Sequence, residues 1–271
     1  MCLHDHHFEN LKKLNYTPVG LGTNKFSDEW LNDKSGENIS HKNKYYGEYT
    51  FYYWIWKNFL PKYNEDFWLG FSGYRYHWAQ DKKLDSDKIN KIINTENFSN
   101  YILKSPSKEW ENYDVILGEK IFVADWKLSK ILKKGYKKLL KNPLAFTKKN
   151  QNIKLHFDIF HGEGFLEKAI DLLDEQNKDD FRRFVLNEKS FNRENLFICK
   201  SKNLMSEYFK SVFNWLFNCE KIFGFELHGY EKTRIYAFLA ERYISYWFQK
   251  NSKVLEWPIF FFDTNKNKLT I

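Results

Sequence analysis

The chain has 271 residues, enough for one large domain with a substantial core, and 20% of them are aromatic, which excludes a disordered chain. Its formal net charge is +8, but Lys127–Lys149 contains nine lysines and no acid, so the excess positive charge is local. A nucleic-acid-binding protein is expected to spread its basic residues along a groove, so we expect no nucleic-acid partner.

Cysteine usage and hydropathy indicate the compartment. The three cysteines, at positions 2, 199 and 219, have no metal-binding spacing and cannot all pair, which favours a reduced environment. The first ten residues contain no apolar signal-peptide core, and no apolar run is long enough to span a bilayer. We therefore expect a cytoplasmic protein with a single domain over residues 1–271.

The first 37 residues offer only weak candidates for a ligand site. His4, His6 and His7 lack the fixed spacing of a tetrahedral metal site, and such a cluster is more often a solvated chain start, so no metal ligands are assigned. Gly20 and Gly22 form a GxG, which is too little for a phosphate-binding loop.

An aromatic helix is predicted from Ser40 to Phe59. Ser40 suits the N-cap position, and aromatic residues recur at spacings of three and four with further aromatics between them. The helix is therefore apolar nearly all round, which predicts burial. Pro61 ends it. Phe67–Phe71 is then typical of a short buried strand, followed by a turn at Ser72–Gly73.

Polar residues gather at the two ends of this stretch, namely Asn38, Ser40, Lys42 and Asn43 at the helix start and Tyr74 and Arg75 after the strand. A helix N-terminus beside the carboxyl end of a strand is where an open α/β sheet binds an anionic ligand. The guanidinium of Arg75 can bind phosphate oxygens bidentately, so, if no acidic motif holds a metal there, it is the natural counter-charge for a phosphate-bearing ligand. The alternative for Arg75 is a structural ion pair.

Two motifs in this stretch form a recognisable pair. The helix is NISHKNKYYGEYTFYYWIWKN, and the strand leads into Gly73-Tyr74-Arg75-Tyr76. The chain resembles a bacterial family of capsular and exopolysaccharide biosynthesis proteins, whose signature pairs NIS-x-KN-x-YxExT-x-YWxWKN with a strand ending in GxxYRR. The second arginine of that motif is replaced here. Later segments also match, namely FNRENLFICK, NWLFNCEKIFGF and RIYAFLAERYISYWFQK, so the resemblance spans most of the chain.

This family is catalogued as a domain of unknown function and treated as nucleotide-sugar glycosyltransferases, some of which act with galactofuranose. The resemblance places His4 at a family histidine in the loop that binds the nucleotide base. It implies a donor site that also includes Gly20, Asn38, Ser40, Lys42, Asn43, Tyr74 and Arg75. The implied partners are a nucleotide sugar and an oligosaccharide or lipid-linked glycan acceptor.

A literal DxD, Asp85-Ser86-Asp87, lies in the polar segment Asp81–Ser107. In many glycosyltransferases of the GT-A type, a DxD ends a strand and binds the metal carried by the diphosphate. This one lies well beyond the predicted strand, so a solvated turn or a helix start is the stronger interpretation. We therefore assign no metal ligands and leave a requirement for Mn or Mg open.

The basic segment Lys127–Lys149 follows one or two strands predicted within Asp114–Val123. Its leucines and isoleucines fall roughly on one helical face among the lysines. A basic amphipathic segment suits an anionic membrane surface, where each lysine contributes about 1 kcal/mol. Peripheral contact with the inner face of the cell membrane and a solvated surface helix are two interpretations of equal weight.

Three side chains are candidates for the chemistry, Asp158, His161 and Glu241. Ile153–Phe160 alternates apolar and polar residues, which predicts a strand and places Asp158 and His161 where a strand ends and a loop opens. For both residues the alternative is a structural role.

Glu241 lies beside Arg242 within a helix predicted over Arg234–Lys250 and capped by Thr233. A glutamate among apolar neighbours must be paired, or neutral with a raised pKa. The alternative to a catalytic role is a buried ion pair that ties this helix to the sheet.

Candidate sugar-binding residues lie near another predicted strand, Asn195–Lys200. In GT-A enzymes a strand of this kind lines the donor sugar and the acceptor, and aromatic faces stack on sugar rings. The candidates are Trp78, Asn195, Phe197 and Arg234. A helix over Leu204–Phe217 and a last strand within Pro258–Asp263 complete the predicted elements.

We therefore expect an α/β fold of GT-A (Rossmann-like) type, with a mostly parallel central sheet flanked by helices and a helical C-terminal part. The expected function is transfer of a sugar from a nucleotide-sugar donor to a growing capsular or surface polysaccharide. The expected donor is UDP-linked, and its sugar is a furanose in some relatives. The rival hypothesis is a non-catalytic module that binds carbohydrate or nucleic acid.

Overall fold

The structure is a computed structural model that describes residues 8–23, 25–125, 135–136, 140, 143–147 and 150–263. His4 and most of the basic segment Lys127–Lys149 lie outside these residues, so their predicted roles stay predictions. The chain divides into two compact units. Unit 1 comprises residues 1–119, 196–209 and 251–271, and unit 2 comprises residues 120–195 and 210–250. Among the described residues, no helix combines the length and the hydropathy needed to cross a membrane.

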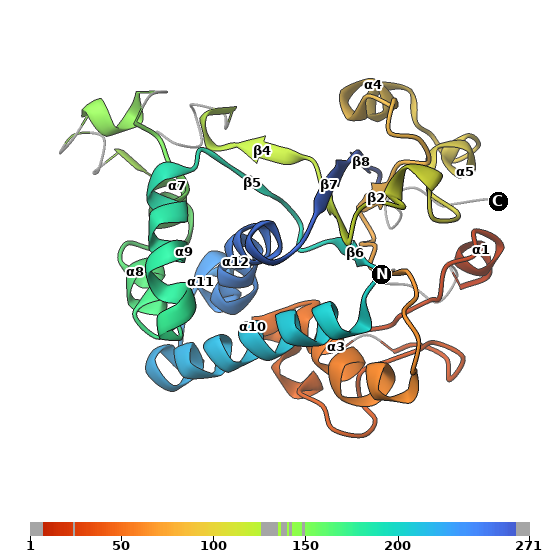
Figure 1. Ribbon diagram of the computed structural model, residues 1–271, viewed down its shortest axis with the longest axis horizontal. Coiled ribbons are helices and arrows are strands. Elements are labelled where there is room, and N and C mark those ends of the chain that lie inside the picture. The colour runs from red at the N-terminus through yellow and green to blue at the C-terminus, as the bar shows by residue number, and fades with distance from the viewer. Residues whose placement is uncertain are drawn as a thin grey trace. The chain divides into compact units, whose positions relative to one another are not determined.

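Unit 1 is built on a four-stranded sheet, in the order β1 (Leu69–Gly70), β6 (Phe197–Cys199), β3 (Val115–Gly118) and β7 (Val254–Trp257). Strands β6 and β7 are labelled in Figure 1. Strand β6 runs antiparallel to β1 and β3, whereas β3 and β7 are parallel. The described sheet is therefore mixed, and the expectation of a mostly parallel sheet is wrong for these strands. A separate antiparallel pair joins β2 (Tyr76–Trp78) to β8 (Ile259–Phe261).

The aromatic helix forms in several pieces. The turn η2 (Ser40–Lys42) and α2 (Asn43–Tyr46) end at Gly47, whose φ of 58° lies in the left-handed region. Then follow α3 (Tyr49–Trp54), the π-helical turn η3 (Ile55–Phe59) and η4 (Leu60–Lys62). Every residue of α3 is buried, as predicted. The break after α2 was not predicted, because the aromatic spacing continues through Gly47.

The remaining helices of unit 1 are short, namely α1 (Phe8–Lys13), α4 (Ser86–Ile92), α5 (Phe98–Tyr101) and η5 (Lys108–Trp110). Asp85 is the N-cap of α4, where its carboxylate accepts hydrogen bonds from the backbone N–H groups of Asp87 and Lys88. The interpretation of the DxD as a helix start is therefore confirmed. The predicted strand Phe67–Phe71 is reduced to β1, whose residues are half-buried or exposed rather than buried.

Unit 2 is mainly helical, with α7 (Ile153–His161), α8 (Phe165–Ile170), α9 (Glu175–Asn187), α11 (Tyr230–Thr233) and α12 (Ile235–Asn251). Its strands β4 (Lys120–Phe122) and β5 (Ser190–Asn192) pair antiparallel, and the short turns η6 (Val123–Asp125) and η7 (Pro143–Phe146) follow β4. Helix α7 packs against α8 and α9 (Figure 1). The long helix α10 (Lys202–Phe223) begins in unit 1 and continues into unit 2.

The segment predicted as a strand over Ile153–Phe160 is helix α7, so that prediction is wrong. Asn152 is its N-cap, and the side-chain Oδ1 accepts a hydrogen bond from the N–H of Leu155 at 2.8 Å. The buried positions are Ile153, His156, Phe157, Asp158, Phe160 and His161. These positions are spaced as on one face of a helix. The pattern was missed because His156 and His161, which are polar, occupy buried positions where an apolar residue is expected.

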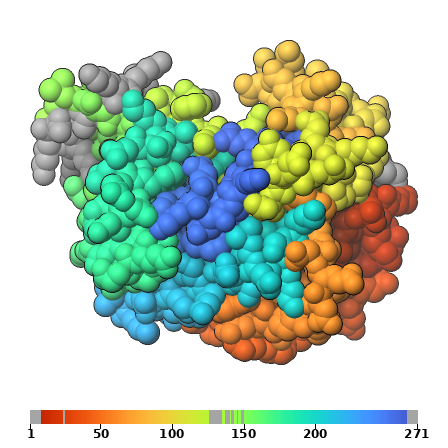
Figure 2. All heavy atoms as spheres, viewed as in Figure 1, coloured from red at the N-terminus to blue at the C-terminus, as the bar shows by residue number. Residues whose placement is uncertain are grey.

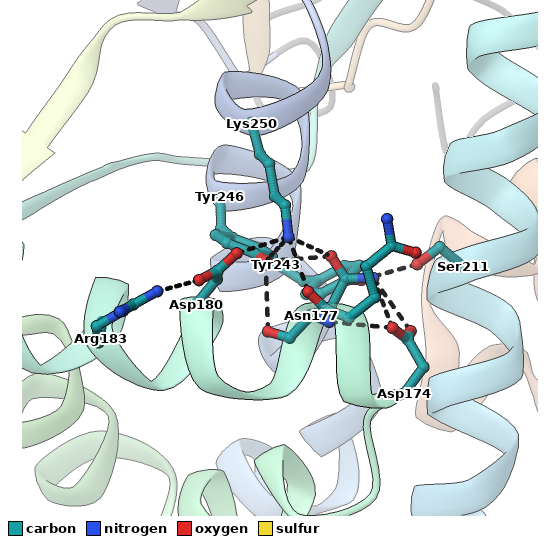
Figure 3. Close-up of polar contacts among 9 residues, drawn as sticks. Asp174, Asn177, Asp180, Arg183, Ser211, Tyr243, Tyr246 and Lys250 are labelled. Atoms are coloured by element: carbon teal, nitrogen blue, oxygen red, sulfur yellow. Dashed lines mark hydrogen bonds and ion pairs between the residues drawn. The ribbon is translucent and has the colours of Figure 1, made fainter.

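The last turn of α12 is fastened to α9 by hydrogen bonds (Figure 3). Lys250 Nζ donates to Asp180 Oδ2 at 2.7 Å and to the carbonyl of Gln176 at 2.8 Å. It also donates to the hydroxyl of Tyr246 at 3.2 Å, and that hydroxyl donates to Oδ1 of Asn177 at 3.1 Å. Two of these hydrogen bonds of Lys250 join α12 to α9, and the third holds the Tyr246 hydroxyl that itself bonds to α9.

Candidate functional site

The helix start in unit 1 is organised by Asn38. Its Oδ1 accepts hydrogen bonds from the backbone N–H of Ser40 at 3.2 Å and from the Ser40 hydroxyl at 2.8 Å. Its Nδ2 donates to the carbonyls of Lys34 and Gly36. The prediction that Ser40 is the N-cap is wrong, since Ile39 occupies that position and Ser40 opens η2. The backbone N–H of Ser40, which was predicted to bind an anionic ligand, therefore already donates to the Asn38 side chain.

Asn58 fixes the loop before this helix start. From the π-helical turn η3, its Oδ1 accepts the N–H of Glu37 at 3.1 Å and its Nδ2 donates to the carbonyl of Glu37 at 2.8 Å. A Cβ added to Gly36 would lie 2.0 Å from Asn58 Oδ1, so only glycine fits there. Such π-helical turns occur often at functional sites.

The glycine loop of residues 18–22 packs against the same helix start. Gly22 has a φ of 81°, and a Cβ added there would lie 3.0 Å from Oδ1 of Asn43. The Nδ2 of Asn43 donates to the carbonyl of Gly47 at 2.9 Å and to Thr50 Oγ1 at 3.1 Å. Gly20 donates its N–H to the carbonyl of Leu31. The structure therefore brings two of the predicted donor segments, the glycine loop and Asn43, together.

Asp33 is a residue of this region that the sequence did not single out. Its side chain is wholly buried, and neither carboxylate oxygen has a hydrogen-bond partner among the described residues. Loss of water around the carboxyl raises the pKa of Asp33 above its ordinary value. Nothing in the polar stretch NDKSGEN marks one acidic side chain as buried.

Arg75 lies in the turn after β1, as predicted. The turn closes when the N–H of Gly73 donates to the carbonyl of Tyr76 at 3.2 Å. The Arg75 side chain is exposed, and its guanidinium carbon lies 4.8 Å from the centre of the Tyr74 ring. No acidic side chain pairs with it within the described chain, so the structure does not show the alternative ion pair.

Two of the predicted sugar-binding aromatics belong to the core of unit 1. Trp78 is 1% exposed, and its Nε1 donates to the carbonyl of Phe71. Phe197 is 0% exposed and contacts the rings of Tyr52 and Tyr208. Burial at this level leaves no ring face for a sugar, so neither residue supports an acceptor site in this arrangement.

Asp158, one of the candidate bases, is engaged within unit 2. It lies inside α7, 7% exposed, rather than at the end of a strand. Lys154 Nζ lies 2.8 Å from its Oδ2, and the N–H of Gly164 donates to its Oδ1 at 3.2 Å. Both oxygens therefore stabilise α7 and the turn to α8, which is the structural alternative.

His161 and Glu241 are joined through Arg242, which is buried on α12. Arg242 Nη2 donates to Nε2 of His161 at 3.1 Å and to Nδ1 of His156 at 3.2 Å. Arg242 Nη1 pairs with Glu241 Oε2. Its guanidinium carbon also lies 4.5 Å from the Phe191 ring centre. Glu241 is therefore in an ion pair, as predicted, but its partner is the next residue of the same helix, so this pair does not tie the helix to the sheet. Two histidines of α7, 86 and 81 residues away in sequence, extend it.

The other oxygen of Glu241 reaches the loop between β5 and β6. The N–H of Glu194 donates to Glu241 Oε1 at 2.9 Å. Glu194 and Asn195 have φ angles of 73° and 54°, a conformation that side chains other than glycine rarely adopt. The Asn195 amide donates to the carbonyl of Ala237 at 3.3 Å. Sequence reasoning missed this loop conformation, since it depends on contacts with a helix far along the chain.

Two further candidates for ligand binding lie in unit 2, namely Arg234 and a groove on the surface of α9 and α12. Arg234 is half-buried, with its guanidinium carbon 5.8 Å from the Tyr230 ring centre. A surface groove of about 360 Å³ lies between α9 and α12, whose atoms meet at the surface in Figure 2. Its cations Arg183 and Lys250 already pair with Asp180. The described chain contains no group of three or more metal-ligating side chains.

Comparison with known proteins identifies the family and the fold. The family model described as a domain of unknown function, DUF4422, matches residues 1–252. No curated protein matches. Among solved structures, the apo structure of the WbbM bifunctional glycosyltransferase is similar, with a TM-score of 0.57 and 19% sequence identity over 86% of this chain. The chain spans 39% of the length of that WbbM chain. The chain therefore belongs to the DUF4422 family and shares a mixed α/β fold with part of a bifunctional glycosyltransferase.

Proposed function

We propose that the protein is a nucleotide-sugar-dependent glycosyltransferase of GT-A type that extends a capsular or surface polysaccharide. The observation that carries the proposal is the similarity of the fold to WbbM over 86% of the chain. In this proposal the donor is a UDP-linked sugar, with a furanose among the candidates. The acceptor is an oligosaccharide or a lipid-linked glycan, and no nucleic acid takes part.

The proposed donor site is the helix start of unit 1. Its parts are the glycine loop that packs on Asn43, the half-buried Lys42, and the exposed guanidinium of Arg75. Backbone amides, an ammonium and a guanidinium are the groups that stabilise a leaving diphosphate. Arg75 supports this role because no acidic side chain neutralises it in the described chain. His4 is assigned to the same site.

The role of Asp85 in the DxD bears on whether the proposed reaction needs a metal ion. Many GT-A enzymes bind Mn or Mg through such a motif, but here Asp85 uses its carboxylate to cap α4. We therefore propose that lysine and arginine side chains, rather than a DxD-bound metal, supply most of the counter-charge for the diphosphate. A transferase that works in this way retains activity in EDTA.

Docking on the inner membrane surface through Lys127–Lys149 is part of the proposal. Three large apolar side chains described within this lysine-rich segment, Tyr136, Leu140 and Leu144, are 51%, 78% and 70% exposed. Exposed apolar groups among lysines suit an anionic lipid surface. Co-sedimentation with vesicles that contain anionic lipid, and none with neutral vesicles, is the expected result.

A panel of nucleotide sugars, each with and without EDTA, tests the function. We expect one UDP-linked sugar to be consumed in the presence of a glycan acceptor, with product detected by mass spectrometry. We also expect UDP alone to raise the melting temperature at moderate salt. The result against the proposal is no turnover of any donor together with stabilisation by an oligonucleotide that falls steeply with salt.

A further inference from the structure

The loop from Asn192 to Asn195 is bound to one face of α12. Three α12 residues spaced four apart contact it, and residues at this spacing lie on the same side of a helix. The carbonyl of Ala237 accepts from the Asn195 amide, Glu241 accepts from the Glu194 N–H, and Ser245 Oγ accepts from the Asn192 N–H at 2.8 Å. Each successive turn of α12 thus contributes one contact to the loop.

These contacts stabilise a costly backbone conformation. A left-handed conformation costs about 1–2 kcal/mol for a residue other than glycine, and here two consecutive residues adopt it. Such conformations persist only where the surrounding structure imposes them, and they are concentrated at active sites and ligand-binding loops. Asparagine adopts this conformation more readily than most residues, so the cost falls mainly on Glu194.

The place of the loop in the chain agrees with a substrate contact. Asn195 is followed by Leu196 and then by β6, whose first residue Phe197 faces Leu117 near the carboxyl end of β3. Strands β3 and β7 are parallel, and open α/β sheets bind their ligands outside the carboxyl ends of such strands. The loop therefore leads directly into β6 in the chain.

We infer that Glu241 is a positioning residue: with its other oxygen paired to Arg242, its carboxylate maintains the left-handed conformation of Glu194 and Asn195, and the Asn192–Asn195 loop contacts a sugar of the substrate. The inference rests on the proposed function. It replaces a role for Glu241 as general base, because both of its oxygens already accept hydrogen bonds within unit 2. Arg242, His156 and His161 extend the same support to α7.

Hydrogen exchange of a peptide that covers residues 191–197 tests the positioning role without any substrate. We expect Glu241→Ala to accelerate exchange there at least 10-fold, while the α7 and α9 peptides stay protected. Because this variant leaves Arg242 buried without its carboxylate, Ser245→Ala serves as a second variant that removes an uncharged contact from the same helix face. Unchanged exchange of the loop in both variants overturns the inference.

Kinetics separate a positioning residue from a base. We expect Glu241→Ala and Ser245→Ala to raise KM for the sugar substrate and to lower kcat/KM, about 10- to 100-fold for Glu241→Ala and less for Ser245→Ala. Glu167→Gln, which removes a carboxylate paired with Arg182 at 2.9 Å elsewhere in unit 2, is the matched control and should be neutral. If Glu241→Gln abolishes kcat while the loop stays protected, Glu241 is the base and the inference is wrong. If the wild type turns over no donor, the proposed function fails, and hydrogen exchange still decides the positioning role.

Discussion

Arg242 Nη2 donates a hydrogen bond to Nε2 of His161 at 3.1 Å. A guanidinium has donors only, so the accepting imidazole nitrogen carries no proton. The same holds for Nδ1 of His156 at 3.2 Å. Both rings of α7 are therefore neutral in the native state, each with its proton on the other nitrogen. A proton added to either ring would remove an acceptor and place two cations side by side.

Acid should destabilise unit 2 through His156. Burial, and then the positive charge of Arg242, hold the pKa of His156 well below its ordinary value of 6.5. The unfolded chain takes up a proton near pH 6.5 that the native state does not. The free energy of unfolding should therefore fall as the pH drops below 6.5, by up to about 1.4 kcal/mol per pH unit. Urea unfolding at several pH values from 7.5 to 5 measures this slope.

The variant His156→Asn isolates this effect, because the Asn Oδ1 can accept the same hydrogen bond but does not titrate. Its pH dependence should be flatter than that of the wild type. His228→Asn, at an exposed position in unit 2, is the matched control and should keep the wild-type slope. Equal slopes for the wild type and His156→Asn would contradict the assignment.

Asp33→Asn should stabilise unit 1 at neutral pH. Burial raises the pKa of Asp33 above 3.8, so between pH 3.8 and the native pKa the native state holds a proton that the unfolded chain has lost. Wild-type stability should thus decrease as the pH rises from 3.8 through the native pKa, whereas the asparagine variant has no such loss. The gain in melting temperature should be larger at pH 7 than at pH 4. Asp87→Asn, at an exposed position of α4, should change neither value.

Gly22→Ala and Gly164→Ala separate backbone strain from contact with Asn43. The two glycines have φ angles of 81° and 79°, so each substitution should cost about 1–2 kcal/mol of stability. A Cβ on Gly164 meets no atom within 4 Å, whereas one on Gly22 displaces the Asn43 amide. Only Gly22→Ala should therefore also reduce the rise in melting temperature produced by UDP. An equal response to UDP in both variants would argue against a donor site there.

Arg75→Ala should abolish most transferase activity and leave the fold intact. The Arg75 side chain is exposed, and within the described part of the chain it stacks on Tyr74, so its removal costs little stability. Loss of its charge removes a counter-charge for the leaving diphosphate. Arg183→Ala, where the guanidinium is 72% exposed in unit 2, is the control for loss of a surface arginine. Full turnover by Arg75→Ala on the correct donor would exclude Arg75 from the site.

Spacing predicted the elements that bury a continuous apolar face. The aromatic stretch before Pro61, the strands around residues 115–122 and the helix over Arg234–Lys250 all form, because their apolar residues coincide with the period of the element. The same reasoning failed over Ile153–Phe160, where four alternating apolar residues suggested a strand. His156 and His161 are buried in α7 because they bind Arg242, which is far away in the sequence. A pattern of apolar residues cannot predict the burial of such polar residues.

The candidate site was harder to predict than the fold. The position of Arg75 in an exposed turn and the ion pair of Glu241 with Arg242 could both be inferred from local sequence. The burial of Asp33 could not, nor could the left-handed loop at Glu194, because each depends on packing between segments far apart in the chain. Trp78 and Phe197 show the converse error, since a core aromatic and a sugar platform look identical in sequence.

The hydrogen bonds of Lys250 have a consequence for the way unit 2 unfolds. Terminal turns of helices normally fray, since their last carbonyls lack intrahelical partners. Here the final turn of α12 is cross-linked to the first turns of α9, because Lys250 bonds to Asp180 and Gln176 and Tyr246 bonds to Asn177 (Figure 3). The two helix ends should consequently open together as one cooperative segment, and the amides at the end of α12 should be as slow to open as those at its centre.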